Sequence, residues 1–435
     1  MNDHRKQLIS LAHPVYFSLL ASVTAGIINT VWVSRLGPDA VAAVAVATNT
    51  ENVLLGVALV FASGTTVLVA HARGARDSAA LRAAVRGGWA LCALVTPVVA
   101  VGGWLLREPL ARLVLGGDGP ALALAVGYFA ISLPGIAVFF AQNLVDGILK
   151  GAGDTRTPMR LALLANGLIL VLDPLLIHAY GVRGAAASTV LCRGVALAAG
   201  LRALRRNGVL RAAATARPAE ATGPALRRTL RTGLPMSADF TVRQTGALVL
   251  VAVVARLGVS AVAAYSIAYK VMYVATMAFY AVRQAASIHT AHTGGAGKDE
   301  RRAIGRQAVL VSGALGLLAA LLLLVLAPWI MRAFGAGPEV AHEGVVFLRC
   351  VGPYLLLMAC CIALGGVFEG SGGAPVLLRV TVLGTAVQLA LAYALSGLGL
   401  PGICLAMALA MAVQCAVLLP RLRRQEVSVS WVRAV

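Results

Sequence analysis

Charged and amide side chains inside long apolar stretches are the residues of this chain that could do chemistry. A charge near the centre of a bilayer costs roughly 2.5–3.5 kcal/mol or more, so a polar residue at that depth usually faces a cavity or a partner. Asp173 and Asn29 each lie eight residues before a glycine, Gly181 and Gly37, at which an apolar stretch ends. We therefore expect these two side chains at similar depth.

Other polar residues of the first half have spacings that allow more than one role. Asn143 and Asp146 are three residues apart and share a helix face. Asp146 could face a pocket, or it could pair locally with Lys150, four residues later. Glu51 could likewise be a pocket carboxylate or the structural partner of Arg193.

In the second half, Asp239 and Arg243 are four residues apart on one predicted helix. This spacing favours an internal ion pair over a substrate contact. His71 and His292 occupy equivalent ends of two apolar stretches, where we interpret them as interfacial residues. No metal site is predicted.

The elements that must hold these side chains are membrane helices. Hydrophobic residues make up 59% of the chain and charged residues only 12%, about half the charge of a soluble protein. A membrane-spanning helix needs about 20 apolar residues. Twelve stretches qualify, and they predict an all-α membrane protein: 14–36, 42–70, 84–106, 123–149, 158–179, 184–204, 233–256, 262–290, 304–327, 341–367, 376–396 and 401–420. Four of them are long enough to predict tilting or bending: 42–70, 123–149, 262–290 and 341–367.

The sequence contains an internal repeat, so that its two halves are similar. Residues 35–43 have the sequence RLGPDAVAA and residues 256–264 have RLGVSAVAA, an offset of 221. The offset drifts to 218–219 further along, where it pairs Pro134 with Pro353 and Gly151 with Gly370. We predict two pseudo-symmetric six-helix lobes, the build in which secondary transporters bind substrate between the halves.

Charge predicts the topology. If the N-terminus is cytoplasmic, 26 of the 37 Lys and Arg residues fall in cytoplasmic segments, a strong positive-inside bias. Both termini are then cytoplasmic in a multi-pass protein of the inner membrane. The predicted domains are an N-terminal lobe at 1–204, a cytoplasmic linker at 205–231 and a C-terminal lobe at 232–435. Because the charges sit in short loops, we expect contact with membrane lipid and not with nucleic acid.

Several function classes lack their motifs. No Walker A sequence, H-E-x-x-H or G-x-S-x-G is present, so neither ATP-driven transport nor a membrane enzyme is indicated. The duplication with polar residues at depth suits alternating access better than a channel.

Three motifs resemble those of multidrug and toxic compound extrusion (MATE) transporters, with the DinF-type branch nearest. Residues 149–159, LKGAGDTRTPM, resemble the family signature L-R-G-x-G-D-T-R-T-P-M. Residues 28–37, INTVWVSRLG, resemble V-D-T-x-W-V-G-x-L-G, and Leu172-Asp173-Pro174 with Gly184-Ala185-Ala186 resembles L-D-P…G-x-A-A. The resemblance covers essentially the whole chain and implies a MATE-type fold with a V-shaped cleft.

The resemblance also implies an ion-coupling site in the first lobe, lined by Asn29, Asn143, Asp146, Asp173 and Thr189, to which we add Glu51. The family usually has Asp where this chain has Asn29, and Asn in some members where it has Asp146. We therefore expect Asp146 and Asp173 to form a coupled pair of carboxylates. Ile169 replaces a usual Asn and removes an oxygen ligand, which favours a proton over sodium as the coupling ion.

For the substrate cavity we predict Asp239, Arg243, Lys270, Arg283 and Gln284. Arg283 stands where the family commonly has a small residue, so it is expected to project into the cavity, where with Arg243 it would favour anionic or amphiphilic cargo. The expected function is ion-coupled antiport that exports small amphiphilic compounds, including antibiotics, from a monomer without cofactors. The alternative is a flippase for lipid-linked saccharide precursors, from the wider superfamily with this fold.

Overall fold

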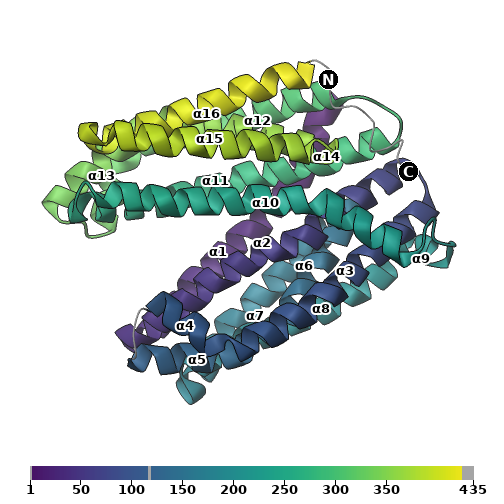
Figure 1. Cartoon of the computed structure of the whole chain (residues 1–435), viewed down its shortest axis with the longest axis horizontal. Helices are drawn as coiled ribbons and strands as arrows, with labels where there is room; N and C mark the ends of the chain where they lie inside the picture. Colours follow the sequence, from purple (N-terminus) through teal and green to yellow (C-terminus); the bar gives the residue numbers. More distant parts are fainter. Residues whose placement is uncertain (1, 116–118, 424–435) are drawn as a thin grey trace. The chain divides into compact units, whose positions relative to one another are not determined.

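The computed structural model of the chain describes residues 2–115 and 119–423, and this part is almost entirely helical (Figure 1). The first half contains α1 (Asn2–Ser34), α2 (Pro38–Gly74), α3 (Ser78–Leu105), α4 (Arg107–Leu115), α5 (Pro120–Ser132), α6 (Ile136–Gly151), α7 (Arg156–Tyr180), α8 (Val182–Arg206) and α9 (Gly208–Thr215). The second half contains α10 (Thr222–Ala255), α11 (Val259–Gly295), α12 (Arg301–Ala333), α13 (Pro338–Cys350), α14 (Gly352–Gly370), α15 (Ala374–Ala394), a short 3-10 helix (Ser396–Leu398) and α16 (Gly399–Arg423).

Eleven helices of the described part are long and apolar enough to cross a membrane, and the number becomes twelve when α5 and α6 count as one bent span. This confirms the prediction of an all-α membrane protein with about twelve spans. Large apolar side chains remain exposed along these helices, such as Val98, Leu248 and Val325, each more than two-thirds exposed. In a membrane protein such surfaces face lipid, which is as apolar as they are.

Two of the four long stretches are interrupted at equivalent prolines. Pro134 lies in the break between α5 and α6, which meet at an angle of 52°. Pro353, its counterpart in the repeat, lies in the first turn of α14, directly after the break from α13. Proline has no N–H and clashes with the preceding helical turn, so it favours a break or a restart of the helix at these two positions, although helices such as α7 and α12 continue through an internal proline. The other two long stretches stay continuous as α2 and α11, each of 37 residues.

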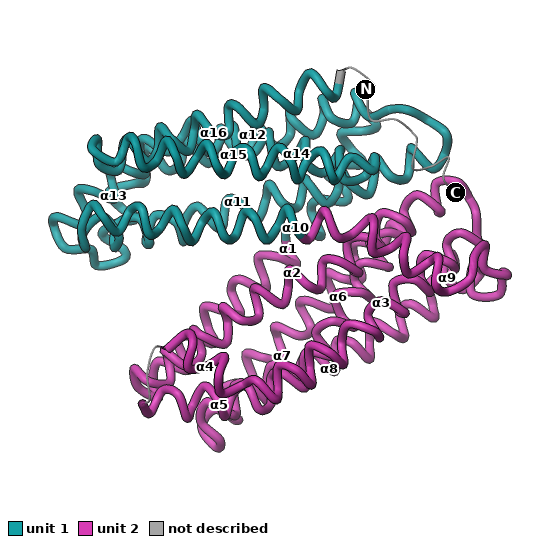
Figure 2. The backbone as a smooth tube through the Cα atoms, viewed as in Figure 1, with its two compact units in different colours: residues 1–16, 238–435 teal, residues 17–237 magenta. Residues whose placement is uncertain are grey.

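The helices gather into two compact units (Figure 2). Unit 1 comprises residues 1–16 and 238–435, and unit 2 comprises residues 17–237. The two limits, 16/17 and 237/238, are again 221 residues apart, so α1 and α10 change units at equivalent positions. The lobe limits at 204 and 232 stay a prediction, and the predicted linker contains α9 and the first turns of α10.

Specific contacts hold each crossing helix to its unit. In unit 1, Nδ1 of His4 on α1 lies 3.0 Å from Nε2 of His289 on α11. In unit 2, the Ser237 hydroxyl of α10 donates to the Gly56 carbonyl of α2 at 2.6 Å. Gly233 of α10 also packs directly on the backbone of Val60, where a Cβ atom would collide with the Val60 carbonyl.

Each unit has its own apolar core. In unit 2, α2 packs against α3, α5 and α6, and α7 packs against α8. In unit 1, α14 packs against α11, α12 and α16. The residues that could do chemistry therefore lie on helices held rigidly by their neighbours, which is what a precise polar site requires.

Candidate functional site

The buried carboxylate of Asp173 is the centre of the polar site in unit 2. Its side chain is 0% exposed, and Nδ2 of Asn29 on α1 donates to its Oδ2 at 2.7 Å. The other oxygen, Oδ1, has no hydrogen-bond partner among the described residues. The predicted proximity of Asn29 and Asp173 is confirmed. An amide cannot neutralise a carboxylate, so the charge of Asp173 is solvated by dipoles alone.

Hydroxyl groups of α5 and α8 extend the site around Asp173. Ser188, which is fully buried, interacts with the carboxylate. Tyr128 of α5 interacts with the Thr189 hydroxyl and lies within electrostatic reach of Asp173. The Thr189 hydroxyl in turn donates to the Ala185 carbonyl one turn earlier, at 3.0 Å. Tyr128 and Ser188 were missed by sequence reasoning, which considered charged and amide residues first.

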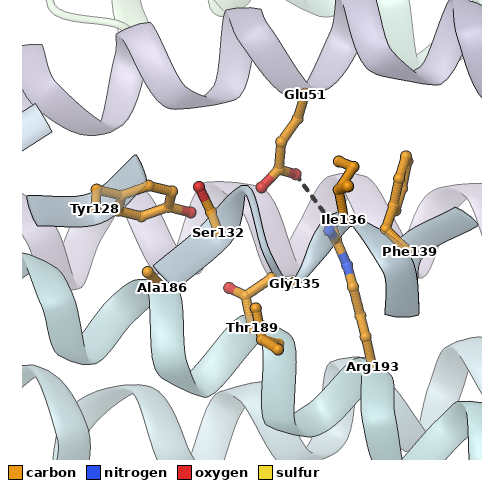
Figure 3. A pocket seen from close by; sticks show the side chains of 10 residues that line it. Glu51, Tyr128, Ser132, Gly135, Ile136, Phe139, Ala186, Thr189 and Arg193 are labelled. Carbon is orange, nitrogen blue, oxygen red and sulfur yellow. Dashed lines mark hydrogen bonds and ion pairs between the residues drawn. The ribbon is translucent and has the colours of Figure 1, made fainter. Parts of the chain in front are cut away.

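A small pocket is lined by Tyr128 and Thr189 and by an ion pair between Glu51 and Arg193 (Figure 3). Nη2 of Arg193 on α8 lies 3.1 Å from Oε2 of Glu51 on α2, and the two side chains are 26% and 24% exposed. The Arg193 guanidinium also lies over the Phe139 ring, 4.8 Å from its centre. Glu51 is thus the partner of Arg193, one of its two expected roles, and it also lines this pocket. Its expected role in ion coupling stays a prediction.

The break between α5 and α6 forms one wall of this pocket. Ser132 and Gly135 flank the break and line the cavity together with Tyr128 (Figure 3). Gly135 lets α8 approach closely, because a Cβ atom there would collide with the side chain of Val190. The cavity volume is only about 10 Å³, close to the minimum for one water molecule. The space suits a water or a small ion and excludes an organic compound.

The structure does not bring Asp146 to Asp173. Asp146 lies five residues from the Gly151 end of α6, whereas Asp173 lies seventeen residues from the Arg156 start of α7. At 1.5 Å per residue these positions differ in depth by about 18 Å, because α6 and α7 are joined at those two ends. The interaction of Asp146 is with Lys150, four residues later.

The expected pair of Asp146 with Asp173 is therefore wrong, and the local pair with Lys150 is the alternative that holds. Counting residues along the apolar stretches 123–149 and 158–179 already indicates this difference in depth. The expectation of a pair came from the family resemblance instead. Asn143 is likewise directed elsewhere, since its Nδ2 donates to the Phe139 carbonyl of its own helix at 2.9 Å.

Unit 1 holds a second polar cluster, built from two acids and two bases. Nε of Arg243 lies 3.1 Å from Oδ2 of Asp239, which confirms the predicted ion pair. Arg283 of α11 lies 2.7 Å from Asp239 and 2.7 Å from Glu369 of α14. Thr381 of α15 donates its hydroxyl to Asp239. Glu369 was not among the predicted cavity residues.

Arg283 does not project into a cavity as expected. Its side chain is buried, 6% exposed, and its charge is balanced by two carboxylates. Gln284 beside it is half-buried, and Lys270 lies exposed on α11. An Arg with two carboxylate partners is not available as a free cation for cargo, so the expectation that Arg283 and Arg243 favour anionic cargo lacks support.

Comparison with known proteins gives a consistent family and fold. The MatE family model matches residues 14–175 and 235–394, one segment in each half of the repeat. A probable multidrug resistance protein NorM from Thermotoga maritima is 25% identical over 377 residues, which cover 85% of this chain and 80% of that protein.

Two solved structures share the fold over nearly the whole chain. A MOP superfamily transporter from Pyrococcus furiosus superposes with a TM-score of 0.88 at 22% identity, covering 98% of this chain and 96% of that one. An outward-facing multidrug resistance MATE family transporter gives a TM-score of 0.88 at 23% identity, covering 97% and 96%. At this identity the likeness establishes the fold of twelve spans in two lobes, and function must be argued from the site.

Proposed function

The chain belongs to the multidrug and toxic compound extrusion family of membrane transporters, and from this premise we propose that it exports small amphiphilic organic compounds in exchange for protons. The relative from Thermotoga maritima is named for multidrug resistance, which supports the cargo class. Assignment to the DinF-type branch stays a prediction.

Asp173 is the observation that carries the proposal. A fully buried carboxylate whose partners are a neutral amide, Asn29, and a neutral hydroxyl, Ser188, is costly to keep ionised. Protonation removes that cost. A lobe that is closed and dry favours the neutral form, and a lobe opened to water favours the anion. The proton thus binds the two conformations with different affinity, which is what coupling requires.

The surroundings of Asp173 favour a proton over sodium as the coupling ion. Sodium needs several oxygen ligands at once, whereas a proton needs one carboxylate oxygen. Ile169, one helical turn before Asp173, presents a buried apolar side chain at a place where an oxygen could have served as a ligand. Asn29 directs its amide nitrogen, a donor, to the carboxylate.

The remaining elements of the proposal follow from the family and from charge. In this proposal the chain acts as a monomer in the cytoplasmic membrane, with both termini cytoplasmic, and transports its cargo by alternating access. No cofactor is needed beyond the coupling ion, and no reaction chemistry is performed on the cargo.

Everted membrane vesicles containing the protein test the proposal. A fluorescent amphiphilic dye should move into the vesicles under an imposed proton gradient and not under a sodium gradient of equal size. Asp173→Asn should abolish this movement while the amount of folded protein in the membrane stays the same. Indifference of dye movement to both gradients contradicts antiport. Movement only of a lipid-linked saccharide would instead support a flippase.

A further inference from the structure

The charged cluster of unit 1 contains two acids and two bases, so its net charge is zero. Arg283 places Nη2 within 2.7 Å of one oxygen of Asp239 and of one oxygen of Glu369, and Nε lies 3.2 Å from the second oxygen of Glu369. Arg243 and Thr381 occupy the second oxygen of Asp239. Two acids from different helices, α10 and α14, thus converge on one guanidinium.

We propose that Arg283 is a built-in cation, which occupies the point between Asp239 and Glu369 and keeps inorganic cations out of unit 1. Neutralising Arg283 would then create a monovalent cation site from the oxygens of Asp239, Glu369 and Thr381. The inference rests on the proposed function only in one respect, that ion coupling is confined to unit 2.

The charge balance of the cluster requires a second positive charge. Asp239 is 1% exposed and Arg283 is 6% exposed, so neither charge is stabilised by water. Two carboxylates with Arg243 alone would leave one net negative charge in the cluster. A buried unbalanced charge is strongly unfavourable, and it is relieved by a bound proton or cation. Arg283 supplies this cation covalently, so no external ion is required.

Close backbone packing between α11 and α14 holds the charged side chains together. At Gly366 an added Cβ would collide with the Arg283 carbonyl, and at Gly370 with the Ser287 carbonyl. The backbones of α11 and α14 are therefore in direct contact around the pair. At Gly365 an added Cβ would lie 3.5 Å from the guanidinium carbon of Arg283, so the guanidinium lies against the surface of α14.

The internal repeat places a charged pair at equivalent positions of both units. The offset of 221 pairs Arg283 with Ala62, and the offset of 219 pairs Gly365 with Asp146 and Glu369 with Lys150. Each unit therefore has one internal pair at this place, Asp146 with Lys150 in unit 2 and Arg283 with Glu369 in unit 1. The equivalent residues are a base in unit 2, Lys150, and an acid in unit 1, Glu369. In both units the local charges at this position balance.

Sodium binding by purified protein tests the inference without transport. The parent is the Asp173→Asn variant, so that the site in unit 2 does not contribute. Binding of radioactive sodium is measured at about pH 8.5, far above the usual range of carboxyl groups, in parallel with thermal unfolding in sodium chloride against choline chloride. The variant is Arg283→Gln, and the matched control is Arg283→Gln with Glu369→Gln, which restores neutrality.

The parent should bind no sodium saturably, and Arg283→Gln should bind about one ion per chain. Its unfolding temperature should rise by about 3 °C or more when sodium is about 100 times its Kd. The control should lose both effects. Sodium binding by the parent that disappears on Glu369→Gln would overturn the inference. So would a folded Arg283→Gln protein that is indifferent to sodium.

A variant that fails to fold is also informative. If Arg283→Gln does not fold, Arg283→Lys and the neutral control should both fold, because each restores charge balance. Folding of Arg283→Lys without folding of the neutral control would show that the base is needed for packing and would overturn the inference. Failure of the dye transport described above contradicts the proposed function alone, since sodium binding is measured separately.

Discussion

Adding a carboxylate beside Asp173 by Asn29→Asp should shift the pH profile of transport to higher pH. Nδ2 of Asn29 lies 2.7 Å from Oδ2 of Asp173, so Asn29→Asp places two carboxylates in contact. Two unit charges at that distance repel by about 6 kcal/mol at an effective dielectric constant of about 20. If relaxation leaves only about a third of this repulsion, about 2 kcal/mol remains, which corresponds to more than one pH unit. The pair should therefore keep one proton to higher pH than Asp173 alone.

The assay is the initial rate of proton-driven dye uptake into everted vesicles, measured as a function of pH. The profile of Asn29→Asp should move to higher pH by about one unit or more. The double variant Asn29→Asp with Asp173→Asn keeps a single carboxylate and is the matched control, whose profile should return toward that of the wild type. Superimposable profiles for Asn29→Asp and the wild type, with Asp173→Asn inactive, would refute the reasoning.

Three further predictions concern other contacts in unit 2. Neutralising either Glu51 or Arg193 should lower the free energy of unfolding by about 1–3 kcal/mol, and neutralising both should lower it by less than the sum of the single changes. Additive losses in a double-mutant cycle of unfolding would contradict the ion pair. Gly135→Ala should cost about 1–3 kcal/mol by overpacking against Val190, so an unchanged unfolding temperature would show that the close contact is absent. Asp146→Asn should leave proton-driven dye uptake within about twofold, because the residue lies about 18 Å from Asp173 in depth; loss of uptake with normal amounts of folded protein would count against this.

The class of protein and the number of spans could be predicted because they depend on composition and periodicity. A stretch of about 20 apolar residues has to be a helix in lipid, where every backbone group must be hydrogen-bonded internally. Length alone predicted bending in four stretches, and the structure shows that the two containing Pro134 and Pro353 are broken. The sequence did not anticipate that α1 and α10 change units at equivalent positions, which only the structure shows.

The candidate site was predicted in part, and the errors have one physical cause. Asp173 with Asn29, Glu51 with Arg193, and Asp239 with Arg243 were each anticipated from depth or spacing. The carboxylate partners of Arg283 were not, and Asp146 pairs with Lys150, which was one of two alternatives. Buried polar groups usually have partners, but which helix supplies them depends on how the helices pack.

The sequence by itself determined that this chain is a duplicated, multi-pass helical membrane protein with a few polar residues at depth, because solvent and helix period act on each segment locally. Only the tertiary structure decided which of those residues meet. Tyr128 and Ser188 join Asp173 through contacts between α5, α7 and α8, and Arg283 is enclosed by acids of α10 and α14. Such pairings depend on the rotation and depth of one helix against another, which are set by close packing at residues such as Gly135 and Gly366.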